Sequence, residues 1–392
     1  MRDTTKITKR FVWAEINLKN LGHNLSIIKS YVNSSQTKIM AIVKADAYGH
    51  GAVEVSRQAV KSGVYGLGVS LVEEGIKLRK AGINVPIYIL GEPSLSVLED
   101  AVKYNLILSV NSYKTADIIS KKCSYLGKKA VVHINVDTGM NRIGISFKNA
   151  ISEIIKISSL PGLKIEGVFT HFSCAYRKDD SYTKLQWNKF RETIQELKNN
   201  KVRIGLFHCA NSAAFLRYKK MHMDMVRIGI LMYGLNPFDG NSSKWLSKET
   251  ADVLSNFKSV LSLKAKISFI KRIPAGQYIS YGCTFRTKRE SVIATIPVGY
   301  ADGYSRLLSN KSKVLINGKF APVVGNVTMD QIMIDATDVT NGSSISTGDE
   351  IVLIGDSEGK RISAEDLADL AGTINYEIVC MLKSRIPRIY GY

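Results

Sequence analysis

Short apolar runs alternate with longer amphipathic segments over the first 230 residues of the chain. Most positions in these runs are apolar, and the run at 39–43 is apolar throughout, which is typical of a strand buried on both faces of a parallel sheet. The segments between them, such as 73–81 and 180–199, have helical periodicity and end near glycine or asparagine. Eight runs are present, at 39–43, 64–69, 86–90, 106–110, 130–136, 165–169, 204–207 and 225–230. Eight βα repeats predict an α/β fold of the (β/α)8 TIM-barrel type, with a doubly wound open sheet as the alternative.

The pattern changes after residue 240. Apolar and polar residues now alternate in short runs divided by Asn-Gly and Gly-Asp turns, which indicates a mostly-β domain. These runs lie at 262–271, 292–297, 314–316, 331–335 and 350–354. A short helix is predicted over 363–373, with Ser363 as N-cap and Gly372 after its end. We therefore predict a barrel domain over 11–245 and a C-terminal β domain over 255–392, to which an alternating run at 11–16 could also belong.

Composition narrows the class of protein. Hydrophobic residues make up 45% and charged residues 22% of the 392 positions, as in ordinary globular proteins. The formal net charge of +20 comes from dispersed lysines without an aromatic-interleaved basic tract, so we expect a solvated surface and no nucleic-acid partner. Five scattered cysteines without a C-x-x-C pair indicate reduced thiols, no metal site and a cytoplasmic protein. No signal-peptide pattern or apolar run of membrane-spanning length occurs, so we expect no membrane association.

The first run, at 39–43, ends in the most informative residues of the chain. Lys44 follows it directly, and Tyr48, Gly49 and Gly51 come next. Ligands bind at the carboxyl ends of parallel strands, and burial disfavours a charged lysine, so Lys44 is placed to act as a nucleophile. The two glycines permit positive φ or a close approach of the backbone to an anion. The alternative is an ordinary strand-end lysine that extends into water.

Polar residues also follow the later barrel strands. Each could be a turn residue, a core histidine or half of an ion pair. Together, at one end of one barrel, they predict a functional site. They are Asp137, Thr138, Gly139 and Arg142 after the fifth strand, His171 after the sixth, His208, Asn211 and Ser212 after the seventh, and Arg227 and Gly229 at the eighth.

Nine segments, in order and in both predicted domains, resemble the alanine racemase family. They are 44–51, 137–144, 170–172, 211–214, 225–229, 280–282, 299–303, 329–331 and 374–377. The resemblance extends from about residue 11 to the C-terminus. It implies a pyridoxal 5′-phosphate (PLP) enzyme that interconverts L- and D-alanine and supplies D-alanine for peptidoglycan. It also implies a homodimer whose active sites are shared between subunits.

The resemblance assigns a role to each site residue. Lys44 would hold the cofactor, and Lys44 and Tyr281 of the other subunit would be the two catalytic bases, one on each face of the substrate. Racemisation removes the Cα proton on one face and returns it on the other, which suits such a pair. Arg227 would face the pyridine nitrogen and, by keeping it unprotonated, restrain side reactions. The other cofactor-binding positions are Tyr48, His171, Asn211, Ser212, Gly229, Ile230 and Tyr376. The substrate-binding positions are Arg142, Met329, Asp330 and Tyr300.

One position departs from the family pattern. Many members carry a carbamate-modified lysine where this chain has Asn135, and asparagine cannot be modified in this way. A bound chloride ion could take the carbamate's place beside Asn135 and Arg142. Substrate choice is also open, because a serine or broad-specificity racemase would share most of these motifs. A non-catalytic PLP-binding protein is a further alternative, which the β domain and Tyr281 disfavour, and a barrel-type decarboxylase would need a glycine-rich phosphate loop that we do not find.

Overall fold

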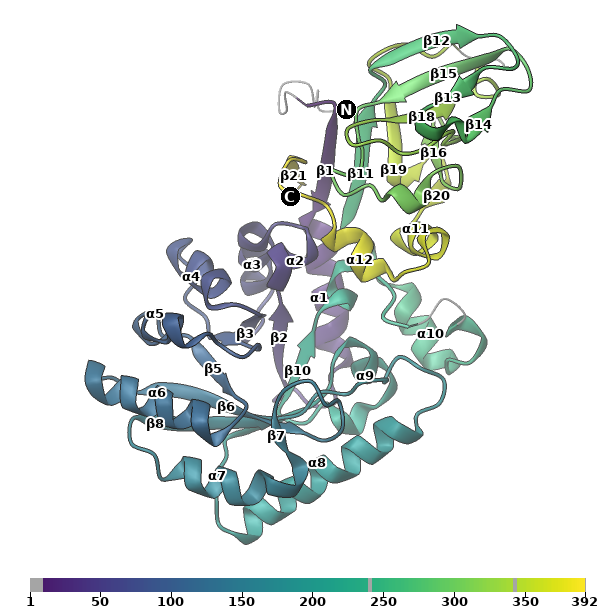
Figure 1. The fold of residues 1–392 in the computed structure, drawn as a ribbon. Coiled ribbons are helices and arrows are strands. Elements are labelled where there is room, and N and C mark those ends of the chain that lie inside the picture. The colour runs from purple at the N-terminus through teal and green to yellow at the C-terminus, as the bar shows by residue number, and fades with distance from the viewer. Residues whose placement is uncertain (1–9, 239–241, 341–343, 392) are drawn as a thin grey trace.

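The computed structural model describes residues 10–238, 242–340 and 344–391. Its larger lobe is a barrel of eight parallel strands in the order β10-β2-β3-β4-β5-β6-β8-β9 (Figure 1). The ladder between β9 and β10 is reduced to single backbone bonds, such as that from Arg227 N–H to Ala210 O at 3.0 Å. The predicted TIM barrel is thus confirmed. Its strands are β2 (Lys38–Ile42), β3 (Gly66–Val69), β4 (Ile87–Ile89), β5 (Ile107–Val110), β6 (Ala130–Asp137), β8 (Leu163–Phe169), β9 (Leu206–His208) and β10 (Met225–Ile228), with the short β7 (Ile145–Ser146) beside β6.

Amphipathic helices surround the barrel and bury one face each against it. In α8, for example, Trp187, Phe190 and Leu197 are buried, while the charged residues Arg191, Glu192 and Glu196 between them are exposed. None of the described helices is both long and apolar enough to cross a membrane. The helices of this lobe are α1 (Leu18–Tyr31), α2 (Lys44–Tyr48), α3 (Ala52–Lys61), α4 (Val72–Lys80), α5 (Leu98–Lys103), α6 (Tyr113–Leu126), α7 (Ala150–Ser158), α8 (Ser181–Asn199) and α9 (Ser212–Arg217), followed by α10 (Lys248–Ser255).

The smaller lobe is rich in strands and stands beyond one end of the barrel (Figure 1). Its main sheet has the order β17-β16-β19-β11-β1-β21, so the first and last strands of the chain pair side by side. A three-stranded sheet, β12-β15-β18, and the hairpin β13-β14 complete the lobe with helices α11 and α12. Its elements are β1 (Val12–Asn17), β11 (Leu261–Lys266), β12 (Phe269–Ile273), β13 (Tyr278–Ile279), β14 (Phe285–Arg286), β15 (Ser291–Ile296), β16 (Lys313–Ile316), β17 (Lys319–Pro322), β18 (Ile332–Asp335), β19 (Glu350–Ser357), β20 (Lys360–Ile362), α11 (Ala364–Ala371), α12 (Asn375–Cys380) and β21 (Arg388–Gly391).

Two local predictions meet different outcomes. The prediction of one strand over the alternating run 262–271 is wrong. These residues form β11 in the main sheet and β12 in the three-stranded sheet. The break falls at Ile267, whose N–H donates to Asp349 O at 3.0 Å and so turns the chain from one sheet to the other. The caps of the helix at 363–373 are confirmed, because Ser363 Oγ accepts the Asp366 N–H at 3.1 Å and Gly372 has φ +70°.

The two lobes share one core. A continuous cluster of buried apolar side chains includes Met40 and Ile228 of the barrel, Val379 of α12 and Leu353 of β19. The second lobe therefore packs firmly enough on the barrel to help shape its open end.

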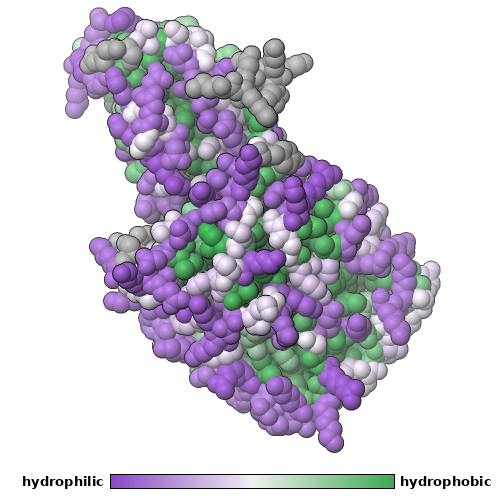
Figure 2. All heavy atoms as spheres, turned by 180° about the vertical axis from the view of Figure 1, so that it is seen from behind, coloured by the Kyte–Doolittle hydropathy of each residue, from purple (hydrophilic) through white to green (hydrophobic). Residues whose placement is uncertain are grey.

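Figure 2 shows one face of the molecule, on which hydrophilic residues are spread over both lobes, as the dispersed lysines predict.

Candidate active site

A cavity of about 580 Å³ opens at the carboxyl ends of the barrel strands. Its walls come from the barrel and, on one side, from α12 of the second lobe. The structure brings together here many residues that the sequence singled out. Those lining the cavity are Lys44, Tyr48, Asn135, Arg142, His171, Asn211, Ser212, Arg227, Gly229, Ile230 and Tyr376.

Lys44 enters the cavity from the end of β2. The strand is buried along most of its length, so the chain delivers Lys44 from the barrel interior to the cavity wall. Burial lowers the pKa of the Lys44 amine, and the positive charge of Arg142 lowers it further. A larger fraction of the amine is therefore neutral, and nucleophilic, than in a lysine in water.

The residues after Lys44 form a left-handed turn. Ala45, Asp46 and Ala47 have φ/ψ near +50°/+50°, and Tyr48 continues it with φ +52°. Residues other than glycine enter this region at a cost of roughly 1–2 kcal/mol each, so their surroundings must hold them there. The Ala45 N–H donates to Glu74 Oε1 at 2.6 Å, and Asp46 Oδ1 accepts the Ala52 N–H at 3.0 Å. The turn aims Lys44 and Tyr48 into the same cavity.

Gly49 and Gly51 close this turn, and both have positive φ, +79° and +93°. A Cβ on Gly49 would lie 2.1 Å from Val379 O, and one on Gly51 would lie 1.9 Å from the Tyr390 hydroxyl. The positive φ matches the sequence interpretation. The close approach that the glycines permit is to α12 and β21 of the second lobe.

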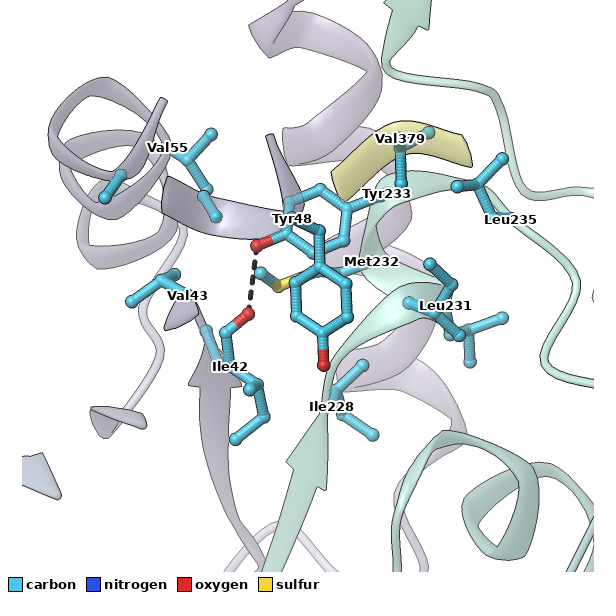
Figure 3. Close-up of a cluster of buried hydrophobic side chains, with 14 of the residues drawn as sticks. Ile42, Val43, Tyr48, Val55, Ile228, Leu231, Met232, Tyr233, Leu235 and Val379 are labelled. Carbon is cyan, nitrogen blue, oxygen red and sulfur yellow. Dashed lines mark hydrogen bonds between the residues drawn. The ribbon is translucent and has the colours of Figure 1, made fainter. Parts of the chain in front are cut away.

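Tyrosine side chains pack together next to the turn (Figure 3). The rings of Tyr48 and Tyr233 lie side by side with centroids 5.2 Å apart, and the Tyr233 hydroxyl donates to Ile42 O at 2.9 Å. The Tyr376 ring also lies near Tyr48, with 6.1 Å between the ring centroids. Burial raises the pKa of both the Tyr48 and Tyr376 hydroxyls, so both remain protonated donors at neutral pH.

The N-terminus of α9 and the end of β10 form the neighbouring wall. Asn211 caps the helix, with its Oδ1 accepting the Ala214 N–H at 3.0 Å. Ser212 Oγ accepts the Gly229 N–H at 3.0 Å and so joins the two segments. A Cβ on Gly229 would lie 2.8 Å from the Tyr48 hydroxyl, which explains the glycine. The hydroxyls of Tyr48 and Ser212 thus lie beside the N-terminus of α9 at this end of the cavity, a combination that suits an anion.

Arg227 forms the floor of the cavity and is only 4% exposed. Its Nη1 donates to His208 Nδ1 at 2.8 Å, and its Nη2 donates to His171 Nδ1 at 3.0 Å and to Thr170 O at 2.8 Å. Burial lowers the pKa of the guanidinium to about 10, so it stays protonated at neutral pH. Burial and the charge of Arg227 hold the pKa values of both imidazoles well below their usual range.

Asn135 lies inside the barrel and is hydrogen-bonded within the chain. Its Nδ2 donates to Asn111 Oδ1 at 2.9 Å and to Ile143 O at 3.2 Å, and Asn111 in turn donates to Glu92 at 2.5 Å. A second, small cavity of about 10 Å³ adjoins Asn135, Arg142, Thr170 and His171. A cavity of this size is large enough for one water molecule or one ion of similar size.

Four predicted residues of the second lobe lie away from this cavity. Tyr281, Met329 and Tyr300 are 76%, 54% and 41% exposed, and Asp330 Oδ1 pairs with Arg385 at 2.8 Å. The loop 326–331 connects them, because Asn326 Nδ2 donates to Tyr281 O and the Tyr300 N–H donates to Thr328 O. They form one exposed group on the face of the second lobe.

Sequence reasoning missed several cavity residues. Glu92, Phe169, Tyr176 and Cys380 line the cavity and were not singled out. His133 was also missed, although it alternates with Asn135 and Asp137 along β6 and therefore points into the barrel with them. That alternation was the available signal. No group of three potential metal ligands occurs within the part of the chain that the structure describes.

Comparison with known proteins finds members of one family that match both lobes of this chain. Residues 16–237 match the family model of the alanine racemase N-terminal domain, and residues 260–390 match that of the C-terminal domain. The chain is 45% identical over 383 residues to the alanine racemase of Halothermothrix orenii, covering 97% of both proteins. It is 44% identical to that of Clostridium novyi, covering 97% of this chain and 95% of that protein.

Solved structures agree in fold. The alanine racemase of Clostridium difficile superposes with a TM-score of 0.90 at 40% identity, covering 98% of this chain and 96% of that chain. The alanine racemase of Bacillus anthracis with bound L-Ala-P superposes with a TM-score of 0.89 at 37% identity and the same coverage. Both lobes and their relative placement are therefore similar to those of these enzymes.

Proposed function

We propose a mechanism for this chain on the premise that it belongs to the alanine racemase family, whose members it matches over both lobes, and is an amino-acid isomerase that interconverts L- and D-alanine. The position of Lys44 carries the proposal. Its amine has a lowered pKa, lies at the carboxyl end of a barrel strand and shares one cavity with Arg227 and with a group of hydroxyls and N–H donors. The end product we propose is D-alanine for peptidoglycan.

The residues of the cavity fit pyridoxal 5′-phosphate. Lys44 supplies the amine that its aldehyde requires, and the hydroxyls of Tyr48, Ser212 and Tyr376 line the wall where the phosphate would lie. The absence of a side chain at Gly229 keeps the Tyr48 hydroxyl free of a clash and leaves room for the phosphate beside it. Asn211 and Ile230 complete this wall, and Arg227 and His171 would lie against the ring. We infer that the chain uses this cofactor.

When bound, pyridoxal phosphate supplies an electron sink that makes the Cα proton of an amino acid acidic. Lys44 Nζ then removes or returns that proton on one face of the substrate. The hydroxyl oxygen of Tyr281 of the partner subunit does the same on the opposite face, so inversion needs both groups. Arg227, which only donates hydrogen bonds, would leave the ring nitrogen unprotonated and so moderate the sink.

Substrate binding is proposed at the mouth of the cavity. Arg142 would hold the substrate carboxylate with two parallel hydrogen bonds, as guanidinium groups do. Tyr300, Met329 and Asp330 of the partner subunit would cover the substrate and limit its side chain to a small size. A homodimer is required by this arrangement, because Tyr281, Tyr300 and Met329 are exposed on their own subunit.

A chloride ion is proposed in the small cavity beside Asn135 and Arg142. Its volume suits one monatomic ion, and Arg142 would provide a positive charge there. The ion would orient Arg142 where a carbamate does so in other members of the family. The proposal also includes a cytoplasmic location, which the five free cysteines support.

The test is an absorbance spectrum of the purified protein, followed by chiral analysis after incubation with L-alanine, L-serine or L-lysine. We expect a band of lysine-bound cofactor that is absent in Lys44→Ala, and D-alanine formed faster than either other product. An exposed lysine provides the control, so Lys19→Met should keep both the band and the activity. A band without any D-amino acid would mean a cofactor-binding protein, and faster D-serine formation would reassign the substrate.

A further inference from the structure

A chain of hydrogen bonds runs from the floor of the cavity through the barrel interior. Arg227 Nη1 lies 2.8 Å from His208 Nδ1, and His208 Nε2 lies 2.9 Å from His133 Nδ1. His133 Nε2 lies 3.1 Å from Glu166 Oε2. His133 and His208 are buried, whereas the Glu166 side chain is 23% exposed. The chain thus joins the candidate active site to a carboxylate near the amino ends of the barrel strands.

Arg227 determines which atom donates and which accepts in each of these three hydrogen bonds. A guanidinium only donates, so His208 Nδ1 must accept and the His208 proton lies on Nε2. That N–H donates to His133 Nδ1, which leaves the His133 proton on Nε2, where it donates to the Glu166 carboxylate. Burial lowers the pKa of both imidazoles, so both are neutral with a single tautomer each.

Arg227 needs a compensating negative charge. It is buried, and its hydrogen-bond partners are two neutral imidazoles and the carbonyls of Thr170 and Cys209. Within residues 10–238, 242–340 and 344–391, no carboxylate forms an ion pair with it. An isolated buried charge is costly, and polarised hydrogen-bond chains transmit part of a distant charge. Glu166 is the first anion that the chain reaches.

The local backbone is shaped for the contact between His133 and Glu166. In the pairing of β6 with β8, Val132 is opposite Ile165 and His133 is opposite Gly167, so Glu166 is the extra residue of a β-bulge. Bulges redirect side chains, often beside active sites. A Cβ at Gly167 would lie 2.5 Å from His133 Cε1, so only glycine admits the imidazole there.

Glu166 stays ionised in this environment. The hydrogen bond from His133 lowers the pKa of the Glu166 carboxyl, and the nearby charges of Lys164 and Lys38 act in the same direction. The Tyr88 hydroxyl, 3.4 Å away, also donates to Glu166 Oε2. A stable carboxylate therefore terminates the chain.

We infer that Glu166 is the remote counter-charge of Arg227, coupled to it through His133 and His208, and that it is a positioning residue for the floor of the cavity. Its consequence for the cofactor rests on the proposed function; the coupling itself does not. The Glu166 carboxylate, which only accepts, matches the tautomers that Arg227 requires, and its charge strengthens the acceptor that Arg227 meets at His208 Nδ1. Arg227 is thereby held as an oriented cation although no carboxylate of the described residues forms an ion pair with it directly.

The test compares Glu166→Gln with Glu192→Gln, a loss of the same charge at an exposed position of α8. Nitrogen-15 spectra of histidine-labelled protein, with cofactor and after its removal, report the tautomer and hydrogen bonding of each imidazole. We expect the Nδ1 resonance of His208, two hydrogen bonds away, to move in Glu166→Gln and not in Glu192→Gln. We also expect about a tenfold weaker affinity for pyridoxal phosphate, as for a weakened charged hydrogen bond.

Glu166→Asp, which keeps the charge, should restore the His208 resonance at least in part, and it serves if the glutamine variant folds poorly. An unchanged His208 resonance in folded Glu166→Gln, or a change of equal size in Glu192→Gln, overturns the inference. If the wild-type protein binds no pyridoxal phosphate, the proposed function fails, while the resonance comparison still decides the coupling.

Discussion

The cavity of the barrel and the exposed face of the second lobe hold the two halves of the proposed site in opposite physical states. In the barrel, Arg227 and His171 are enclosed and hydrogen-bonded to several partners. On the second lobe, the Tyr281 side chain is 76% exposed, and the hydrogen bond that Asn326 Nδ2 donates there goes to the backbone carbonyl of Tyr281. In the proposed function, a single chain thus builds the half that binds the cofactor and displays the half that completes the partner's site.

The difference also separates what each half requires. Groups that hold a cofactor need fixed geometry, which burial and hydrogen bonds provide. Groups that meet a partner need access, and a cluster of exposed tyrosine and methionine side chains is typical of an interface. The two halves should therefore respond differently to mutation.

The largest effect is expected for Tyr281→Phe. Loss of one catalytic acid–base group should lower kcat by roughly 10²–10⁴-fold. Because the side chain is exposed, the free energy of unfolding should change by no more than about 0.5 kcal/mol. Racemisation rates and denaturant unfolding measure the two quantities. Tyr278→Phe, in the same region and 58% exposed, is the matched control and should keep its activity.

Subunit mixing sharpens that result. Lys44→Ala and Tyr281→Phe homodimers should each be inactive. After random exchange of subunits, half of the dimers are mixed, and each mixed dimer has one intact pair of Lys44 and Tyr281, so roughly a quarter of the wild-type activity should return. No recovery despite confirmed exchange would mean that both groups act within one chain.

The contact between the two regions is tested next, at Gly49. Gly49→Ala combines a positive φ with a clash against Val379 O of α12, whereas Gly82→Ala has a similar φ of +83° and no atom within 4 Å. Both should lose about 1–2 kcal/mol of stability from the backbone, and Gly49→Ala about 1–3 kcal/mol more from overpacking. Equal losses in denaturant unfolding would show that the clash is relieved by movement of α12.

The smallest effect concerns pH. The pKa of Lys44 is lowered in the folded state, so between that pKa and the unfolded value near 10.5 the unfolded chain binds more protons. The contribution of Lys44 to the free energy of unfolding therefore rises with pH in that window. After cofactor removal, Lys44→Met should be more stable than wild type at pH 7, and the gap should narrow towards pH 10. Lys19→Met, at an exposed site, should show no such narrowing; a constant gap for Lys44→Met contradicts the prediction.

The barrel could be predicted because its signal is repeated. Eight apolar runs of similar length, each followed by a helical segment, leave few other folds. The break between β11 and β12 could not be predicted, since residues 262–271 keep one alternating pattern while the chain passes from one sheet to another. Register and sheet membership depend on partners distant in sequence, here Asp349.

The site divides in the same way. Lys44 directly follows the first apolar run and Arg227 lies within the last one, and these positions associate both residues with strand ends. The left-handed turn of Ala45 to Tyr48 was not predictable, because alanine and aspartate favour other conformations and only tertiary contacts hold them there. The contact of Glu166 with His133 could not be predicted for a related reason. The bulge that turns Glu166 towards His133 shifts the register of a strand by one residue.

The position of β1 has a consequence for how the protein is made. This strand leaves the ribosome before the barrel, yet it lies between β11 and β21, whose residues are translated much later. The barrel can therefore close while both edges of β1 are still unpaired. Unpaired strand edges are templates for association with other nascent chains. Synthesis of β21 ends that exposure, so the last strand to emerge protects the first.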